Sequence, residues 1–318
     1  MSAAWWVNHN GTFTHEVGGG YLWSPQREKL ARSTAYDNMR RIKRGDFVIS
    51  YAGQLTRHIG RATDCAIAAP KPKEFGAAGA AWSTLGWYVP VQWNELPTPF
   101  QHREHWDVFK DLLPERYSPI VEKTQRGNQK VYLAEVSLSL FEFVAKASGV
   151  DTEAYAASPL EDRPAASVLE AVESEVEAVI SSDLALEDTT RLQLSSARRG
   201  QGKFRTAVQQ RGAACRVTGL DHPDLLIASH IKPWWACKNG NERIDGANGL
   251  MLAPHVDRLF DRGFITFSDE GDVKVSPHIS DAMLISLGLP DLRKTNVGPF
   301  LEEQRVYLAH HRETFLAG

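Results

Sequence analysis

The chain has 318 residues, of which 42% are hydrophobic and 24% are charged, so it is not disordered throughout. Its length is about twice that of a common single domain, and two domains are therefore predicted. No run of about 18 apolar residues is present to span a bilayer, and the first residues lack a secretory signal pattern. We expect a soluble protein of a bacterial-type cytoplasm, with no membrane partner.

The first 145 residues are predicted to form a β-rich domain with short helices. Residues 47–51, 87–93 and 131–136 combine β-branched and aromatic side chains as strands do. Residues 36–42 and 105–113 have helical patterns that end before Gly45 and at Pro114. The composition then turns to Ala, Ser, Gly and Pro, which predicts a linker from residue 146.

Charge is strongly segregated along the chain, although the net charge is only −3. Residues 151–188 contain 1 basic and 11 acidic side chains (1 − 11 = −10), and residues 198–243 contain 9 basic and 3 acidic ones (9 − 3 = +6). An amphipathic acidic helix is predicted over residues 168–180, followed by helices at 190–199 and 203–210. The acidic helix either covers the basic surface as a phosphate mimic or is only a spacer.

The most informative stretch reads as strand, loop, strand and helix between residues 225 and 263. The first strand ends at His230, and Pro254 and Gly263 suit the start and the end of the helix. Asp257 and Asp261 are four residues apart, so they share one helix face that a packed hairpin would turn towards His230. This arrangement predicts a divalent-ion site beside a general base.

Each of these residues also has a structural interpretation. His230 suits a protein core, the two aspartates could pair with Arg258 and Arg262 at the surface, and Asn248 could simply form a turn. The order and spacing of these residues, taken together, favour the catalytic interpretation.

Residues 200–267 resemble an HNH endonuclease domain of the ββα-metal type. The resemblance implies that His230 is the general base, that Asn248 braces its loop, and that Asp257 and Asp261 bind the metal. Many relatives carry a metal-binding Asp or His immediately before the base, where this chain has Ser229. Either the helix carboxylates hold the ion together with water, or His255 or Ser229 assists them.

The expected cofactor of this domain is Mg²⁺ or Mn²⁺, with Ni²⁺ or Co²⁺ as substitutes in vitro. No structural zinc is expected, because Cys65, Cys215 and Cys237 lie far apart and form no CxxC pair. The side chains expected to contact DNA phosphates are Arg198, Arg199, Lys203, Arg205, Lys232 and Arg243.

Several motifs in the first domain, in this order, resemble the EVE domain of the PUA superfamily. They are residues 21–25, 43–52, 59–62, 75–82 and 86–93. The resemblance implies a small β-barrel-like fold that reads modified bases. The predicted pocket walls are Trp23, Pro25, Trp82 and Tyr132, and the alternative for all four is an ordinary β-domain core.

The sequence as a whole predicts an α+β protein with three segments. These are an EVE domain at 1–145, a helical linker at 146–188 and an HNH domain at 189–318. This combination resembles type IV-like, modification-dependent restriction endonucleases, which flip and read 5-methylcytosine or 5-hydroxymethylcytosine in DNA. The substrate is expected to be double-stranded DNA, and single-stranded DNA is the alternative. The oligomeric state is left open, and a dimer is one option. The rival hypotheses are a nuclease for modified RNA and a DNA-binding module with a decayed nuclease.

Overall fold

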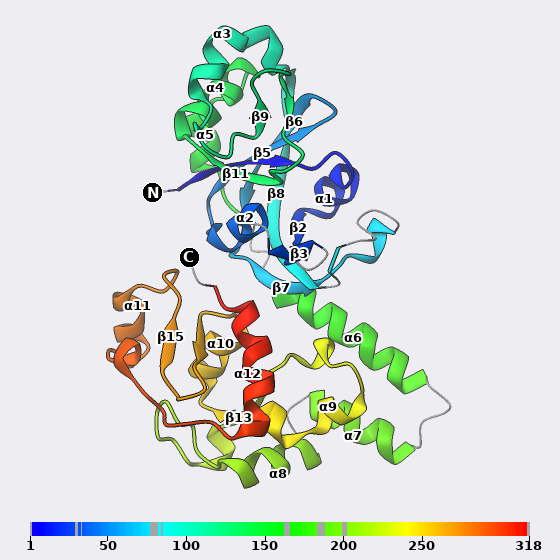
Figure 1. Ribbon diagram of the computed structural model, residues 1–318, viewed down its shortest axis with the longest axis vertical. Helices are drawn as coiled ribbons and strands as arrows, with labels where there is room; N and C mark the ends of the chain where they lie inside the picture. The colour runs from blue at the N-terminus through cyan, green and yellow to red at the C-terminus, as the bar shows by residue number, and fades with distance from the viewer. Residues whose placement is uncertain are drawn as a thin grey trace. The chain divides into compact units, whose positions relative to one another are not determined.

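The computed structural model describes residues 2–28, 31–32, 34–76, 82–83, 85–161, 166–182, 188–198 and 202–316 (Figure 1). The chain divides into two compact units, Met1–Ser167 and Val168–Gly318. Strands and helices are mixed in both units, and each has its own core of buried apolar side chains. The division falls inside the segment predicted as a linker.

The first unit is built on a sheet of seven strands in the order β11-β1-β5-β6-β8-β2, with β7 also paired to β8. β1 and β5 run parallel, whereas the other neighbours are antiparallel. The strands are β1 (Ala4–Asn8), β2 (Tyr21–Pro25), β5 (Phe47–Ala52), β6 (Leu55–Ala62), β7 (Ile67–Pro70), β8 (Leu85–Phe100) and β11 (Leu133–Val136). Two small hairpins pair β3 (Arg27–Glu28) with β4 (Ala31–Arg32) and β9 (Ile120–Val121) with β10 (Arg126–Gly127).

The strands predicted at 47–51, 87–93 and 131–136 are confirmed as β5, β8 and β11. The two helices predicted in this unit are broken into shorter turns, and in this respect the prediction is wrong. The first consists of α2 (Thr34–Asp37) and a 3₁₀ turn (Asn38–Arg41), and the second has α3 (Trp106–Phe109) between two 3₁₀ turns. Segments this short gain few helical hydrogen bonds, so packing against the sheet decides their shape.

A buried carboxylate ties the first strand to the turn before β5. Asp46 accepts hydrogen bonds from the Ala3 amide at 2.8 Å, from Trp5 Nε1 at 2.9 Å and from the Lys43 amide at 3.0 Å. Gly45 beside it has a φ of 91°, which a residue with a side chain rarely adopts. These contacts explain why a Gly-Asp pair precedes the buried strand.

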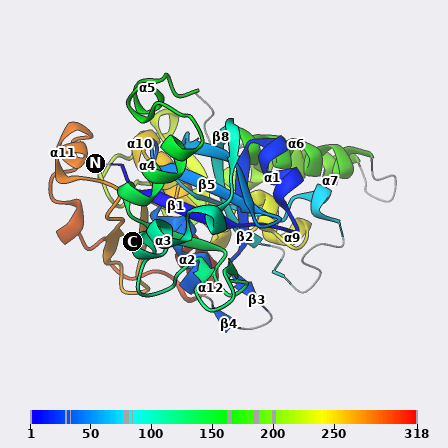
Figure 2. The ribbon, with the colours of Figure 1, turned by 90° about the horizontal axis from the view of Figure 1, so that it is seen from above.

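The start of the predicted linker is folded onto the first unit. It contains the end of α4 (Leu138–Ala147) and all of α5 (Thr152–Ala157), which Asp151 caps. The two helices are neighbours in both views (Figures 1 and 2). The rings of Phe141 and Tyr155 pack between them, with their centroids 6.2 Å apart. The described part of this unit also contains α1 (Phe13–Gly19) and a 3₁₀ turn (Lys73–Phe75).

The second unit contains the predicted order of strand, loop, strand and helix. β12 (Ile227–His230) pairs with β13 (Gly249–Leu252), and α10 (Pro254–Asp261) follows. The other elements are α6 (Ala166–Ser182), α7 (Asp188–Arg198), α8 (Gly202–Arg211), α9 (Gly240–Ile244), β14 (Ile265–Phe267), β15 (Val273–Val275), α11 (Asp281–Ser286) and α12 (Glu302–Thr314). The predicted helices at 168–180, 190–199 and 203–210 are thus confirmed as α6, α7 and α8.

The predicted ends of α10 also hold. Pro254 occupies the first turn, where its missing N–H costs nothing. Gly263 lies just beyond the helix with a φ of 68°, and its amide donates to the Phe260 carbonyl at 2.8 Å. The helix therefore spans the eight residues that carry the two predicted metal-binding aspartates.

Candidate active site

The β12–β13 hairpin places His230 at the strand end, opposite Gly249. The Nε2 atom of His230 lies 2.9 Å from the carbonyl oxygen of Arg243. Because a carbonyl can only accept, Nε2 carries the proton and Nδ1 is the bare nitrogen of the neutral ring. Within the described part of the chain, no hydrogen-bond partner for Nδ1 is found.

Burial lowers the pKa of His230 to about 4, and the nearby Arg243 charge adds to this effect. The imidazole is therefore neutral at pH 7. A neutral ring with one bare, unpaired nitrogen is the form that a general base needs.

Asn248 is fully buried and holds both ends of the loop after His230. Its Oδ1 accepts from the Lys232 amide at 2.8 Å, and its Nδ2 donates to the carbonyls of Lys232 at 3.2 Å and Glu242 at 3.1 Å. The loop that supplies the Arg243 carbonyl to His230 is thereby fixed. Asn248 thus contacts both sides of this loop, and its bracing role stays a prediction.

The two helix aspartates meet at Ser229. Its hydroxyl donates to Asp261 Oδ1 at 3.3 Å. Burial raises the pKa of the Asp257 carboxyl, and a hydrogen bond with Ser229 and the charge of Arg258 oppose this rise. Asp257, Asp261 and the serine hydroxyl next to the base thus lie on the same side of the hairpin.

This donor set fits a hard divalent ion held by few protein ligands. Mg²⁺ commonly binds through one or two carboxylates and keeps waters or substrate phosphate oxygens for the rest. His255 is half-buried, and among the described residues no group of three or more His, Cys, Asp or Glu side chains is arranged to bind a metal. The aspartate pair with Ser229 is therefore the best candidate for the site.

Two of the predicted phosphate ligands are engaged within the loop instead. Lys232 is buried and its Nζ lies 2.6 Å from Glu242 Oε2. Arg243 donates to the carbonyls of Trp234 at 3.2 Å and Cys237 at 3.0 Å. Both cations thus bind groups of the loop; Lys232 is buried, whereas Arg243 is only half-buried. The pairing with Glu242 was not predicted, since nothing in the local pattern marks that glutamate.

The other predicted phosphate ligands lie around α7 and α8. Arg205 donates to the carbonyls of Leu226 and Pro223, whereas Lys203 is exposed. Arg198 forms an ion pair with Glu177 of the acidic helix and donates to Ser174 Oγ at 3.2 Å. Arg199 lies outside the described residues.

Two of the four predicted base-pocket residues, Trp23 and Tyr132, bind a carboxylate that the sequence did not single out, Glu16. Its Oε1 accepts from the Trp23 amide at 2.8 Å and from the Tyr132 hydroxyl. Trp23 is 1% exposed and Pro25 is buried, while Trp82 is half-buried with its ring 6.1 Å from that of Trp23. Trp23 and Pro25 thus belong to the core, and Trp82 is the more accessible ring beside them.

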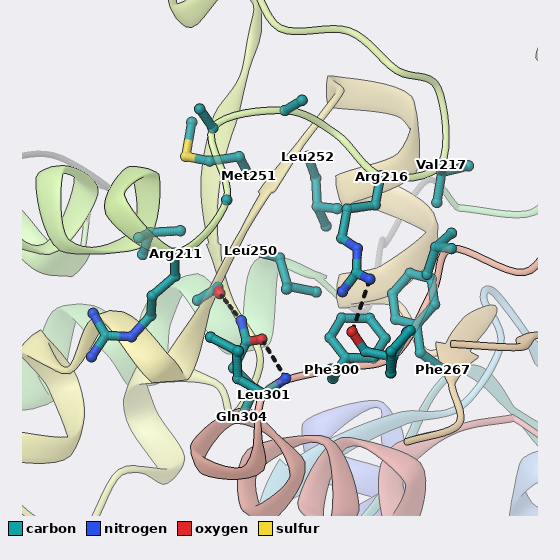
Figure 3. A pocket seen from close by; sticks show the side chains of 17 residues that line it. Arg211, Arg216, Val217, Leu250, Met251, Leu252, Phe267, Phe300, Leu301 and Gln304 are labelled. Carbon is teal, nitrogen blue, oxygen red and sulfur yellow. Dashed lines mark hydrogen bonds between the residues drawn. The ribbon is translucent and has the colours of Figure 1, made fainter. Parts of the chain in front are cut away.

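A separate cavity of about 340 Å³ lies beside β13 in the second unit (Figure 3). Arg216 stacks over Phe300 with its guanidinium carbon 4.4 Å from the ring centre, and it donates to the Pro299 carbonyl at 3.0 Å. None of the predicted catalytic or metal-binding residues lines this cavity. It is therefore distinct from the candidate active site.

Comparison with known families supports the assignment of the second unit. Residues 215–268 match the family model described as HNH endonuclease, and this interval contains His230, Asn248, Asp257 and Asp261. The chain therefore carries an HNH endonuclease domain. No match was found among curated proteins.

Several solved structures are similar to part of the chain. A protein from Rhodopseudomonas palustris is 17% identical, with a TM-score of 0.30 over 46% of this chain and 93% of that one. A protein from Agrobacterium tumefaciens is 15% identical, with a TM-score of 0.30 over 47% and 94%. The N-terminal domain of Staphylothermus marinus McrB is 9% identical, with a TM-score of 0.32 over 46% and 94%.

Within the described residues, no helix has the length and apolar character needed to cross a membrane.

Proposed function

We propose that the protein is a metal-dependent DNA endonuclease whose first unit directs cleavage to modified bases. The observation that carries the nuclease part is the orientation of His230, whose protonated nitrogen is fixed on the Arg243 carbonyl while Nδ1 stays bare. The proposal for the first unit is supported by its EVE-like motifs and by the aromatic cluster beside Trp82.

The chemistry follows from these groups. His230 Nδ1 takes a proton from the attacking water, so that hydroxide adds to the phosphorus in line with the leaving 3′ oxygen. Asp257 and Asp261 would hold a divalent ion, which supplies positive charge against the phosphate oxygens and the leaving oxygen. The products are a 5′-phosphate and a 3′-hydroxyl. Lys203 and other exposed cations of this unit would contact flanking phosphates.

Recognition would take place in the first unit by base flipping. Extrusion of a base costs a few kcal/mol, and stacking on an aromatic ring returns about 1 to 3 kcal/mol. Trp82 is the ring best placed to supply this stacking, because it is the more exposed member of the cluster. The proposed targets are 5-methylcytosine and 5-hydroxymethylcytosine.

The test is cleavage of one plasmid prepared with cytosine, 5-methylcytosine or 5-hydroxymethylcytosine, in Mg²⁺, Mn²⁺ or EDTA. We expect cleavage of the modified plasmids in either metal and none in EDTA. The His230→Ala variant is the matched control, since it should bind modified DNA within about twofold of the wild type but not cut it. Equal cleavage of all three plasmids would refute the proposed recognition of modified bases. Cleavage in EDTA would refute the proposed metal dependence.

A further inference from the structure

We propose that Phe204 is a positioning residue that fixes the plane of the His230 ring, an inference that rests on the proposed role of His230 as base. The two rings are stacked with centroids 3.9 Å apart and an interplanar angle of 3°. Phe204 is 1% exposed and lies on α8, 26 residues before the histidine, which is why the sequence pattern did not reveal it.

The stack supplies a restraint that the hydrogen bond alone does not. The contact to the Arg243 carbonyl fixes one ring nitrogen, but the ring can still tilt about that bond, because the outer torsion of histidine is soft. A second ring lying flat against the imidazole excludes this tilt. Nδ1 then keeps one direction relative to Ser229 and the aspartates.

A second histidine in the same unit provides an internal comparison. His311 stacks on Phe260 with centroids 3.7 Å apart and an angle of 4°, and its Nε2 also contacts a backbone carbonyl. Its Nδ1, however, is bonded to Thr266 Oγ1 at 2.9 Å, so no nitrogen is left for chemistry. His230 and His311 thus share a stacked ring and a carbonyl contact, and of these two histidines only His230 keeps a bare nitrogen.

Glycine residues opposite the base allow α8 to come close enough for this stack. A Cβ atom on Gly249, the strand partner of His230, would lie 2.3 Å from Val208 Cγ2 and 2.9 Å from Phe204 Cζ. One on Gly246 would lie 2.6 Å from the Ala207 carbonyl. Any side chain at these positions would push the helix away from the hairpin. The stack is thus part of how the domain packs.

The test compares Phe204→Leu with Val208→Ala, a matched control one turn further along the same helix. Val208 is also buried and also packs against Gly249, but it makes no ring contact with His230. We expect the single-turnover cleavage rate of Phe204→Leu to fall by about a hundredfold with DNA Kd within about twofold, since small misplacements of a catalytic group are costly. The control should lose stability but less than about threefold in rate.

A second readout does not require activity. Nitrogen-15 NMR of the histidine rings should show a protonated Nε2 and a bare Nδ1 at His230 in the wild type and in Val208→Ala. In Phe204→Leu the two signals should broaden or average as the ring moves. Phe204→Met, which retains most of the volume but not the flat ring, should behave like Phe204→Leu and serves if the leucine variant does not fold.

Equal rates for Phe204→Leu and Val208→Ala, or unchanged His230 signals in Phe204→Leu, would overturn the proposal. If the wild type cuts no DNA, the proposed function fails, and the NMR comparison still decides whether Phe204 holds the ring.

Discussion

Replacement of Asn248 by alanine is the sharpest test of how the active-site loop is held. The change removes the side chain that bonds three backbone groups, namely the buried amide and carbonyl of Lys232 and the part-buried carbonyl of Glu242. A buried polar group left unsatisfied costs about 1 to 3 kcal/mol. Taking the lower value for each, the loop should lose about 3 kcal/mol, which corresponds to an opening equilibrium raised by roughly a hundredfold.

The assay is hydrogen–deuterium exchange of peptides that cover residues 232–248, together with plasmid cleavage. We expect exchange in these peptides to accelerate by on the order of a hundredfold and cleavage to be lost, because the carbonyl that orients His230 belongs to this loop. Asn248→Asp keeps the acceptor for the Lys232 amide but turns a carboxylate oxygen towards two carbonyl oxygens. It should therefore open the loop about as much as alanine does.

Asn239→Ala is the control within the same loop. Its side chain caps the short helix α9 by accepting from the Glu242 amide at 3.0 Å, and it lies at an exposed position. Loss of such a cap costs about 1 kcal/mol, so exchange should rise by less than about tenfold and cleavage should persist. Unchanged exchange and wild-type cleavage in Asn248→Ala would refute the bracing role.

Four further predictions concern the metal, the base reader, the pH response and the acidic helix. Asp257→Ala should be inactive in Mg²⁺, and added Mn²⁺ should recover part of the cleavage rate if metal affinity is what fails; no recovery would indicate a structural role. Trp82→Ala should lower the ratio of modified to unmodified DNA bound in titrations, and an unchanged ratio would place this ring outside the pocket. The folded pKa of His230 lies near 4 against 6.5 in an unfolded chain, so the stability that its neutral form provides is present above pH 6.5 and is lost as pH falls towards 4. Between pH 7 and pH 4.5 the loss should be roughly 2 kcal/mol and smaller in His230→Gln, as measured by urea unfolding. Glu177→Ala removes one ion pair between the acidic helix and Arg198, so cleavage of unmodified DNA at low salt should increase if the acidic helix acts as a phosphate mimic, and a spacer helix would leave it unchanged.

Much of the nuclease unit could be predicted from the sequence because its signals are local. Pro254 and Gly263 mark the two ends of α10, and the four-residue spacing places Asp257 and Asp261 on one face of it. In the first unit, the β-branched and aromatic composition of residues 47–51 likewise predicts the buried strand β5. Such features depend on the backbone conformation of a few consecutive residues. The type of each side chain strongly restricts that conformation.

The contacts that define the site depend on residues distant in the chain, and only the tertiary structure decided them. Phe204 reaches His230 from another helix, and Lys232, one of the predicted phosphate ligands, is instead neutralised by Glu242. In the first unit, the buried Glu16 draws Trp23 and Tyr132 into a hydrogen-bonded core. The sequence by itself determined which residues can carry the chemistry. Which of them face solvent follows from the fold, because burial depends on neighbours that local sequence does not specify.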